Sequence, residues 1–198
     1  MQPFITLRSA AVPFARANID TDQIIPARFL SRPRAIDHGQ FLFHDLRQAP
    51  DGEQRPDFPL NRLHWRDARI ALGGRNFACG SSRESAVWAM YDHGFRAVIA
   101  PSYGDIFANN SVKNGMLAVV LPRDAVDALM AEAEATPGAE IDIDLPAQTV
   151  TSAAGTWSFD IDPYAKKSLL EGLDELAFTL THESDIAAFE HRMGRDNR

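Results

Sequence analysis

The stretch RIALGGRNFACGSSRESAVWAMYDHGFRAVIAPSYGDIFANNSVKNGMLAVVL, residues 69–121, decides the fold of this chain. In it, short apolar runs that stop at Gly or Pro alternate with segments of helical character that precede a glycine. The apolar runs are 69–72, 96–100 and 117–121, and the helical segments are 82–93 and 105–113. Strands that alternate with helices over short connections build parallel sheets. The stretch therefore predicts βαβ units in an α/β fold.

The flanking segments extend this prediction. Residues 140–145 alternate strictly between polar and apolar, as a half-buried strand does. The further expected elements are a strand over 4–12, an Ala-rich helix over 124–135, a hairpin of strands 148–151 and 156–159, helices over 163–171 and 184–193, and a frayed tail over 194–198. Residues 31–62 contain four prolines and several charges, and we interpret them as a long surface loop.

Composition and charge exclude several classes of protein. The chain has 198 residues, of which 45% are hydrophobic and 24% charged, as expected of one globular domain. Its net charge is 20 − 27 = −7, which argues against a nucleic-acid or anionic-membrane partner. Its one cysteine, Cys79, cannot form an internal disulfide or hold an iron–sulfur cluster, which takes about four ligands. With no apolar span and no signal-peptide pattern, we expect a soluble, cytoplasmic protein.

Gly80-Ser81-Ser82-Arg83-Glu84 lies between the first strand of the central stretch and its helix, and it is the first candidate site. Ser81 followed three residues later by Glu84 fits a capping box, in which Ser81 would cap the helix. The loop would then direct free backbone N–H groups and a positive helix end to one point, next to the planar guanidinium of Arg83. One interpretation is only a stable helix start; the other is an anion site at the carboxyl end of a strand.

The kind of anion follows partly by elimination. The P-loop ending GK[ST], the dinucleotide fingerprint G-x-G-x-x-G and the hydrolase elbow G-x-S-x-G are all absent from residues 73–84. A carboxylate ligand remains, with a serine close enough to take a proton. Because a serine hydroxyl is a very poor base, it would need the positive field of Arg83 and the helix end.

Two other segments contain candidate ligand contacts. In Asn18–Arg28, turn chemistry explains Asp20 best, and Arg28 is a candidate second carboxylate clamp. Ser102 follows the second strand of the central stretch, and the nearby Asn109 and Asn110 would face a ligand, a partner chain or solvent. None of the six histidines has close metal-ligand spacing, so we predict no metal site. His93, in the last turn of its helix, is placed where a cation suits the helix dipole.

The motifs at 18–28, 76–86 and 100–115 together resemble the small-subunit family of 3-isopropylmalate dehydratase (isopropylmalate isomerase), within the aconitase superfamily. Residues 159–163, 169–174 and 180–183 resemble the same family, so the likeness runs in order along nearly the whole chain. The resemblance implies one swivelling, three-layer β/β/α domain over 1–198, with a parallel βαβ core and a smaller, partly antiparallel β layer. It also implies a mobile substrate loop at about 27–62.

The resemblance further implies a function shared between two chains. A large-subunit partner would carry a [4Fe–4S] cluster, and this chain would bind no cofactor itself. The pair would interconvert 2- and 3-isopropylmalate, small dicarboxylates, by dehydration and rehydration in leucine biosynthesis. Ser81 would take the proton next to a carboxylate, and Ser82 and Arg83 would hold carboxylate oxygens, with Arg28 and Ser102 as further substrate contacts. We expect the chain to be inactive alone.

Three departures from the family pattern leave the substrate open. Ser85 stands where the family usually has His, and Ala78 stands where it usually has Gly. Residues 34–41 lack the Gly-Phe-Gly pattern that is usual in the substrate loop. The alternatives are a related hydro-lyase small subunit, for citraconate and methylmalate, homoaconitate or dimethylmalate, and a non-catalytic paralogue. An independent carboxylate- or phosphate-binding enzyme is a further alternative, disfavoured by the missing phosphate motifs.

Overall fold

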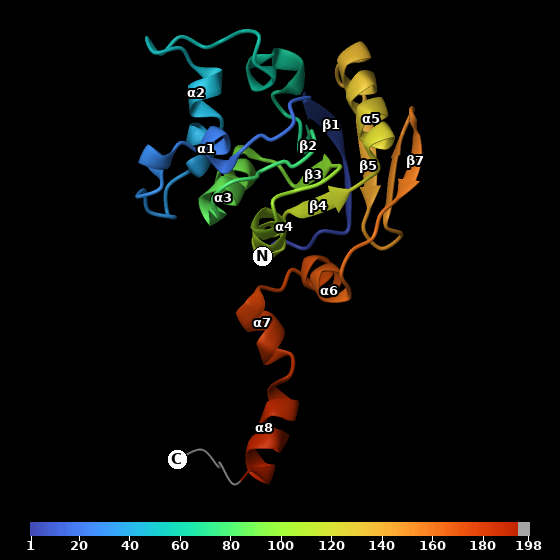
Figure 1. Cartoon of the computed structure of the whole chain (residues 1–198). Coiled ribbons are helices and arrows are strands. Elements are labelled where there is room, and N and C mark those ends of the chain that lie inside the picture. The colour runs from blue at the N-terminus through green and yellow to red at the C-terminus, as the bar shows by residue number, and fades with distance from the viewer. Residues whose placement is uncertain (194–198) are drawn as a thin grey trace.

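The computed structural model describes residues 1–193, and within them seven strands form one mixed sheet (Figure 1). The order across the sheet is β4-β3-β2-β1-β5-β6-β7. The strands are β1 (Thr6–Phe14), β2 (Ile70–Gly73), β3 (Ala97–Ala100), β4 (Leu117–Val120), β5 (Glu140–Asp144), β6 (Thr149–Ser152) and β7 (Gly155–Ser158). Every strand predicted from the sequence is confirmed, and so is the α/β fold class. The tail expected to fray, 194–198, lies outside the described residues.

Strand β1 joins a parallel half of the sheet to an antiparallel half. Residues 11–14 pair in parallel with β2, and β2, β3 and β4 continue in parallel. Residues 6–10 of the same strand pair antiparallel with β5, and the hairpin β6–β7 completes the sheet. The parallel core and the antiparallel β layer therefore share one long strand, and the carboxyl ends of β1 to β4 lie at one edge.

Helices cover both faces of the parallel half. Successive strand residues point to opposite faces, so Ile70 and Leu72 pack with α5 (Arg123–Ala135) while Ala71 packs on the other side. That other side is covered by α3 (Glu84–His93) and α4 (Asp105–Lys113). The C-terminal helices are α6 (Pro163–Glu171), α7 (Glu175–Leu180) and α8 (Glu183–Arg192). The six-residue α7 was not predicted, because a helix so short shows too little periodicity.

The segment expected to be a surface loop is partly core. It contains α2 (His44–Arg47), the 3-10 turns at 38–41 and 59–61, and fully buried Leu42 and Phe43. Near the start of the segment, Arg34 pairs through both its Nη atoms with the Asp92 carboxylate of α3, at 2.8 and 2.9 Å, so this segment is attached to the body. Apolar residues spaced irregularly among prolines and charges form no periodic pattern, and the sequence gives no signal that they are buried.

Candidate active site

Three connections meet at the carboxyl edge of the parallel strands. The loop after β1 contacts the loop after β2 through backbone hydrogen bonds from Asn18 N to Arg75 O (2.9 Å), Thr21 N to Cys79 O (2.9 Å) and Cys79 N to Ile19 O (3.2 Å). The Asn76 side chain adds a bond to the Asn18 amide oxygen at 2.9 Å. These contacts hold the Gly80–Arg83 segment at a fixed place on the sheet edge.

The loop after β3 is attached to the same point. Phe77 N donates to Ser102 O and Gly104 N donates to Phe77 O, both at 2.9 Å. A Cβ added at Gly104 would lie 2.5 Å from the carbonyl oxygen of Ala78, so only glycine permits this close approach. The hydroxyl of Tyr103 contacts the carbonyl oxygens of Val98 and Val119, which anchors the loop to β3 and β4.

A hollow of about 190 Å³ opens between these loops and contains the predicted serines and arginine. Its lining residues are Thr21, Ala78, Gly80, Ser81, Ser82, Arg83, Gly104, Asp105, Ile106 and Phe107. Ser81 and Ser82 are exposed, while Arg83 is half-buried. Thr21 donates its hydroxyl hydrogen to the Ser81 carbonyl at 2.9 Å, a contact that no sequence signal revealed. The structure thus brings Ser81, Ser82 and Arg83 together around one space.

The predicted capping box at Ser81 is wrong. α3 begins at Glu84, its N-cap residue is Arg83, and no side chain caps it. Gly80 has φ +90°, a conformation that turns the chain so that Ser81 and Ser82 lie outside the helix. As a result, within residues 1–193 the N–H groups of 80–83 donate to no protein acceptor, and the Ser81 hydroxyl has no protein partner. These donors are available to an anion.

Arg83 already contacts one carboxylate. Its Nη1 donates to Oδ1 of Asp22, which lies in α1 (Thr21–Ile24) and is half exposed. No other acceptor for the Arg83 side chain occurs in the described part of the chain, so its remaining N–H donors are unpaired. The guanidinium is thus oriented by Asp22 while one edge stays available for a second carboxylate.

The other two predicted contacts do not line this hollow. Arg28 binds the carboxylate of Asp45 through both terminal nitrogens, and this guanidinium lowers the Asp45 pKa to about 2. The hydroxyl oxygen of Ser102 accepts a hydrogen bond from Asn76 N at 2.9 Å, so Ser102 connects two loops. Their roles as substrate contacts stay predictions. A substrate carboxylate would have to compete with Asp45 for Arg28.

Asp20, His93 and the pair Asn109 and Asn110 lie outside the serine hollow. Asp20 is a turn residue as predicted, since its side chain accepts from Gln23 N at 2.8 Å in a capping box that starts α1. His93 is not suited to be a cation, because burial, with a contribution from nearby Arg47, lowers its pKa to about 4. Asn109 and Asn110 line a groove between α4, α6 and α7 instead of the serine hollow.

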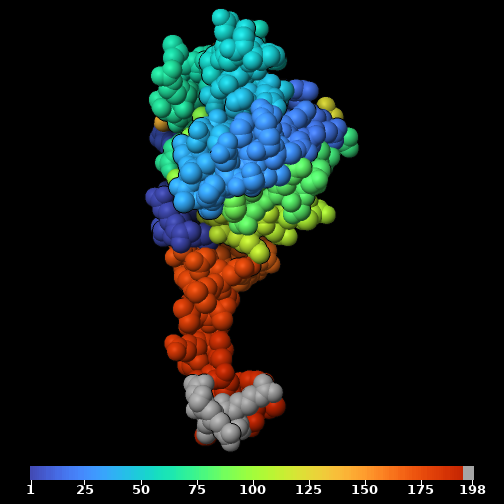
Figure 2. Space-filling view, turned by 90° about the vertical axis from the view of Figure 1, so that its left-hand side faces the viewer, coloured from blue at the N-terminus to red at the C-terminus, as the bar shows by residue number. Residues whose placement is uncertain are grey.

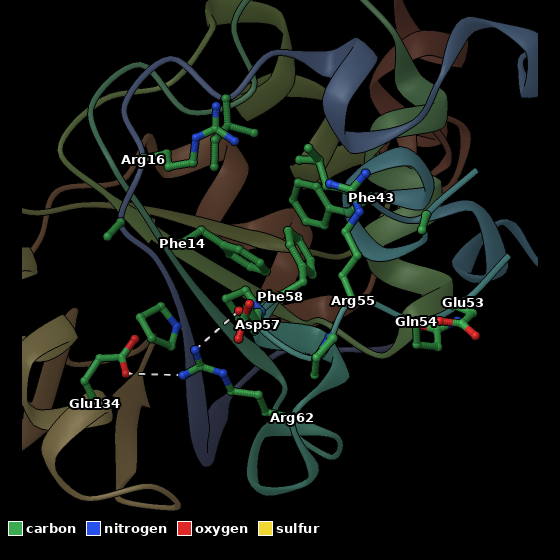
Figure 3. Close-up of a pocket in the computed structure, with 17 residues that line it drawn as sticks. Phe14, Arg16, Phe43, Glu53, Gln54, Arg55, Asp57, Phe58, Arg62 and Glu134 are labelled. Carbon is green, nitrogen blue, oxygen red and sulfur yellow. Dashed lines mark hydrogen bonds and ion pairs between the residues drawn. The ribbon is translucent and has the colours of Figure 1, made fainter. Parts of the chain in front are cut away.

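A cavity larger than the serine hollow lies elsewhere, between the end of β1 and residues 43–62 (Figure 3). It has a volume of about 720 Å³, and the rings of Phe14, Phe43 and Phe58 converge in it. At its edge Arg62 is bound to Glu134 at 3.8 Å and to the Asp57 carbonyl at 3.3 Å. None of the predicted site residues lines it, and its walls carry three arginines and three acidic side chains, which favour no ionic ligand.

Within residues 1–193 no three His, Cys, Asp or Glu side chains lie close enough together to hold a metal ion. Over the same residues, no helix has the length and apolar character needed to cross a membrane.

Comparison with known proteins identifies the family. The aconitase C-terminal domain model matches residues 1–124, and the LeuD_N model matches residues 127–163. The 3-isopropylmalate dehydratase small subunit of Roseobacter denitrificans is 47% identical over 191 residues, covering 96% of this chain and 95% of the relative. That of Halalkalibacterium halodurans is 48% identical over 191 residues, covering 96% and 98%. The chain belongs to the 3-isopropylmalate dehydratase small-subunit family.

A solved structure shares the fold of this family member. The crystal structure of 3-isopropylmalate dehydratase (leuD) from Methanocaldococcus jannaschii matches with a TM-score of 0.67, at 21% identity, over 93% of this chain and 99% of that one. This likeness confirms the fold, and the two relatives at 47% and 48% identity confirm the family predicted from the motifs. Of the departures from the family pattern, Ser85 is buried in the first turn of α3 and does not line the hollow, whereas Ala78 does.

Proposed function

We propose that this chain is the small subunit of a 3-isopropylmalate dehydratase, a hydro-lyase of leucine biosynthesis that interconverts 2- and 3-isopropylmalate. The observation that supports it most is the hollow itself. Residues 80–83 all line it, and within residues 1–193 their four backbone N–H groups, the Ser81 hydroxyl and one edge of the Arg83 guanidinium have no protein partner. This donor set fits a carboxylate with an acidic C–H bond beside it. The relatives that share nearly the full chain carry the same name.

In this proposal Ser81 is the base. Its Oγ takes the proton from the carbon next to the substrate carboxylate and returns it in the reverse step. The N–H groups of residues 80–83 and the Arg83 guanidinium supply a positive field that favours the alkoxide form. Because the Ser81 hydroxyl has no protein partner within the described chain, no competing hydrogen bond has to break first.

Ser82 and Arg83 hold the substrate carboxylate. The unpaired edge of Arg83 can bind carboxylate oxygens while Asp22 keeps the guanidinium in place. An ammonium cannot form this planar, two-pronged contact, so Arg83→Lys should raise KM for the dicarboxylate and leave the fold intact. An unchanged KM in Arg83→Lys would show that Arg83 does not bind the substrate carboxylate.

The name small subunit implies a large-subunit partner. A [4Fe–4S] cluster bound to that partner would supply the Lewis acid that assists departure of the substrate hydroxyl group. This chain has a single cysteine and so lacks the thiolates that such a cluster needs. Its own contribution is therefore the base and the carboxylate clamp, and we expect no turnover from the chain alone.

A reconstitution tests the proposed function. The full chain is mixed with the large subunit encoded in the same genome, the cluster is restored without oxygen, and the unsaturated intermediate is followed by its absorbance. Turnover of isopropylmalate, but not of citraconate or homoaconitate, is the expected result. Turnover only of another dicarboxylate would keep the reaction class and refute the leucine pathway. Full turnover by the pure chain would refute the two-chain mechanism.

A further inference from the structure

The last two helices form an arm, residues 174–193, that projects from the body in both views of the molecule (Figures 1 and 2). Neither α7 nor α8 contains a buried residue. A ten-residue helix such as α8 is marginal in water on its own, because most helical stability comes from packing of an apolar face. The body buries no residue of α8, so the apolar side chains of this helix stay uncovered.

The arm has an apolar face. Leu176 and Leu180 are four residues apart in α7, and Ile186, Phe189 and Met193 follow at spacings of three and four along α8, which places each set on one helix face. Their exposed fractions are 69% and 58% in α7, and 41%, 54% and 58% in α8. Such a face, left in water, is typical of a helix that binds in a groove of another protein.

The arm is continuous with the candidate active site. Ile106, which is 49% exposed, lines the serine hollow and also a groove of about 370 Å³ between α4, α6 and α7. Tyr164 lines the same groove, and its ring packs edge-on against Phe178 of α7 with centroids 4.4 Å apart. The hollow, the groove and the arm therefore form one continuous surface. A protein that covers Ser81 would also contact Ile106, and it could extend along the groove to the arm.

The charge of the arm favours a different protein over a second copy of this chain. α8 carries Glu183, Asp185 and Glu190 against one Arg192, and the whole chain has a net charge of −7. Glu175 is already bound to Lys113 on the body, at 2.7 Å. Two such arms would repel each other, whereas an apolar groove edged with Lys or Arg would attract one.

We infer that the arm is the docking element by which this chain binds its large subunit, with the apolar face of α7 and α8 in a groove whose edges are basic. The inference rests on the proposed function, because that function supplies the large subunit. It adds a division of labour within the chain: residues 80–83 carry the chemistry, and residues 174–193 carry the affinity for the partner.

The test compares affinities for the large subunit by titration calorimetry. Ile186→Ser/Phe189→Ser should weaken binding about 100-fold, since burial of each large apolar side chain contributes about tenfold. Leu63→Ser is the matched control, because Leu63 is 76% exposed but lies on the 3-10 turn at 63–65, outside the arm. It should bind within about twofold of wild type. Both variants should keep the wild-type melting temperature, because all the substituted side chains are exposed.

Turnover separates this inference from the proposed function. At saturating large subunit the arm variant should reach wild-type kcat, because Ser81 is untouched. Binding that follows the prediction without isopropylmalate turnover would support the arm and refute the function. Wild-type affinity in the arm variant would refute the arm. A chain that sediments as a dimer, and becomes monomeric in the arm variant with unchanged affinity for the large subunit, would assign the face to a second copy and also refute it.

Salt tests the basic edges separately. Glu183→Gln/Asp185→Asn/Glu190→Gln should make the affinity less dependent on ionic strength than in wild type, because screening acts on these charges. An unchanged salt dependence would refute the basic groove.

Discussion

The two halves of the sheet differ in how their strands are connected, and the chemistry follows that difference. In the parallel half, β1, β2 and β3 end in loops that meet and place Ser81, Ser82 and Arg83 around one hollow. In the antiparallel half, β5, β6 and β7 are joined by tight turns. A parallel strand must be followed by a crossover that starts at the carboxyl edge, which leaves room there for loops with unpaired donors.

Backbone conformation shows the same contrast. Of the five non-glycine residues with positive φ within residues 1–193, three (Asn18, Asn76 and Ala78) lie in the loops at the hollow, and one (Gln148) lies in the antiparallel half. Residues in this region cost free energy and persist only where the surroundings fix them. The backbone bonds between these loops do so. The site is therefore a rigid feature of the parallel half.

The largest difference between the halves should appear in turnover. Ser81→Ala should lower kcat of the reconstituted enzyme by about a thousandfold or more, the range of a lost general base. Stability to urea should not change, because Ser81 is exposed and does not cap α3. Ser158→Ala, an exposed serine of β7, is the matched control and should keep full turnover. Near-normal kcat in Ser81→Ala would show that another group is the base.

The close contact between the loops at the site should affect the free energy of unfolding. Gly104→Ala would place a methyl group 2.5 Å from Ala78 O, so the backbone has to shift, at a cost of about 2–3 kcal/mol in the free energy of unfolding. Gly138→Ala, before β5, meets nothing within 4 Å and has only the strain of φ +91°, worth about 1 kcal/mol. Urea unfolding measures both. If Gly138→Ala were the more costly, the loop contact would not be tight.

The strands, the parallel pairing of the central ones and the candidate site segment could be predicted from the sequence, because these depend on local patterns. Alternation marked β5, apolar runs marked β2 to β4, and Gly80–Glu84 was placed at a strand end. The prediction from sequence was wrong where backbone geometry determines the structure, as at the start of α3. Residues 81–84 fit the capping-box pattern S-x-x-E, but Gly80 has a positive φ and the helix starts only at Glu84, with no side-chain cap.

Contacts over long sequence separation were also invisible to the sequence. Thr21 fixes the Ser81 carbonyl across 60 residues, and Asp22 reaches Arg83 across 61. Similarly, the pairing of Arg28 with Asp45 depends on how α2 packs, which no periodicity encodes. Partners of this kind could be proposed only after the three loops had been placed side by side.

Acid should destabilise the parallel half through His93, at the far end of α3. Its pKa is about 4 in the folded chain, against about 6.5 unfolded, so the unfolded state binds more protons between these values. Stability should therefore fall from pH 7 to pH 4.5, by on the order of 2 kcal/mol from this group. His93→Gln should remove that part of the loss, measured by urea unfolding at both pH values. His182→Gln, at a side chain 50% exposed, should not; an equal effect in both would contradict the assignment.

The smallest effect is expected at Ala78, where the chain departs from the glycine usual in its family. At φ +55° an alanine is strained by about 1–2 kcal/mol, which Ala78→Gly would relieve. Against this, the buried methyl contributes about 0.8 kcal/mol, and a glycine loses more freedom on folding, about 0.4–1 kcal/mol. The terms nearly cancel, so the free energy of unfolding should change by less than about 0.5 kcal/mol, with turnover unchanged. An increase in the free energy of unfolding above about 1.5 kcal/mol would mean that backbone strain at Ala78 dominates, and that this strain at the hollow lowers the stability of the parallel half.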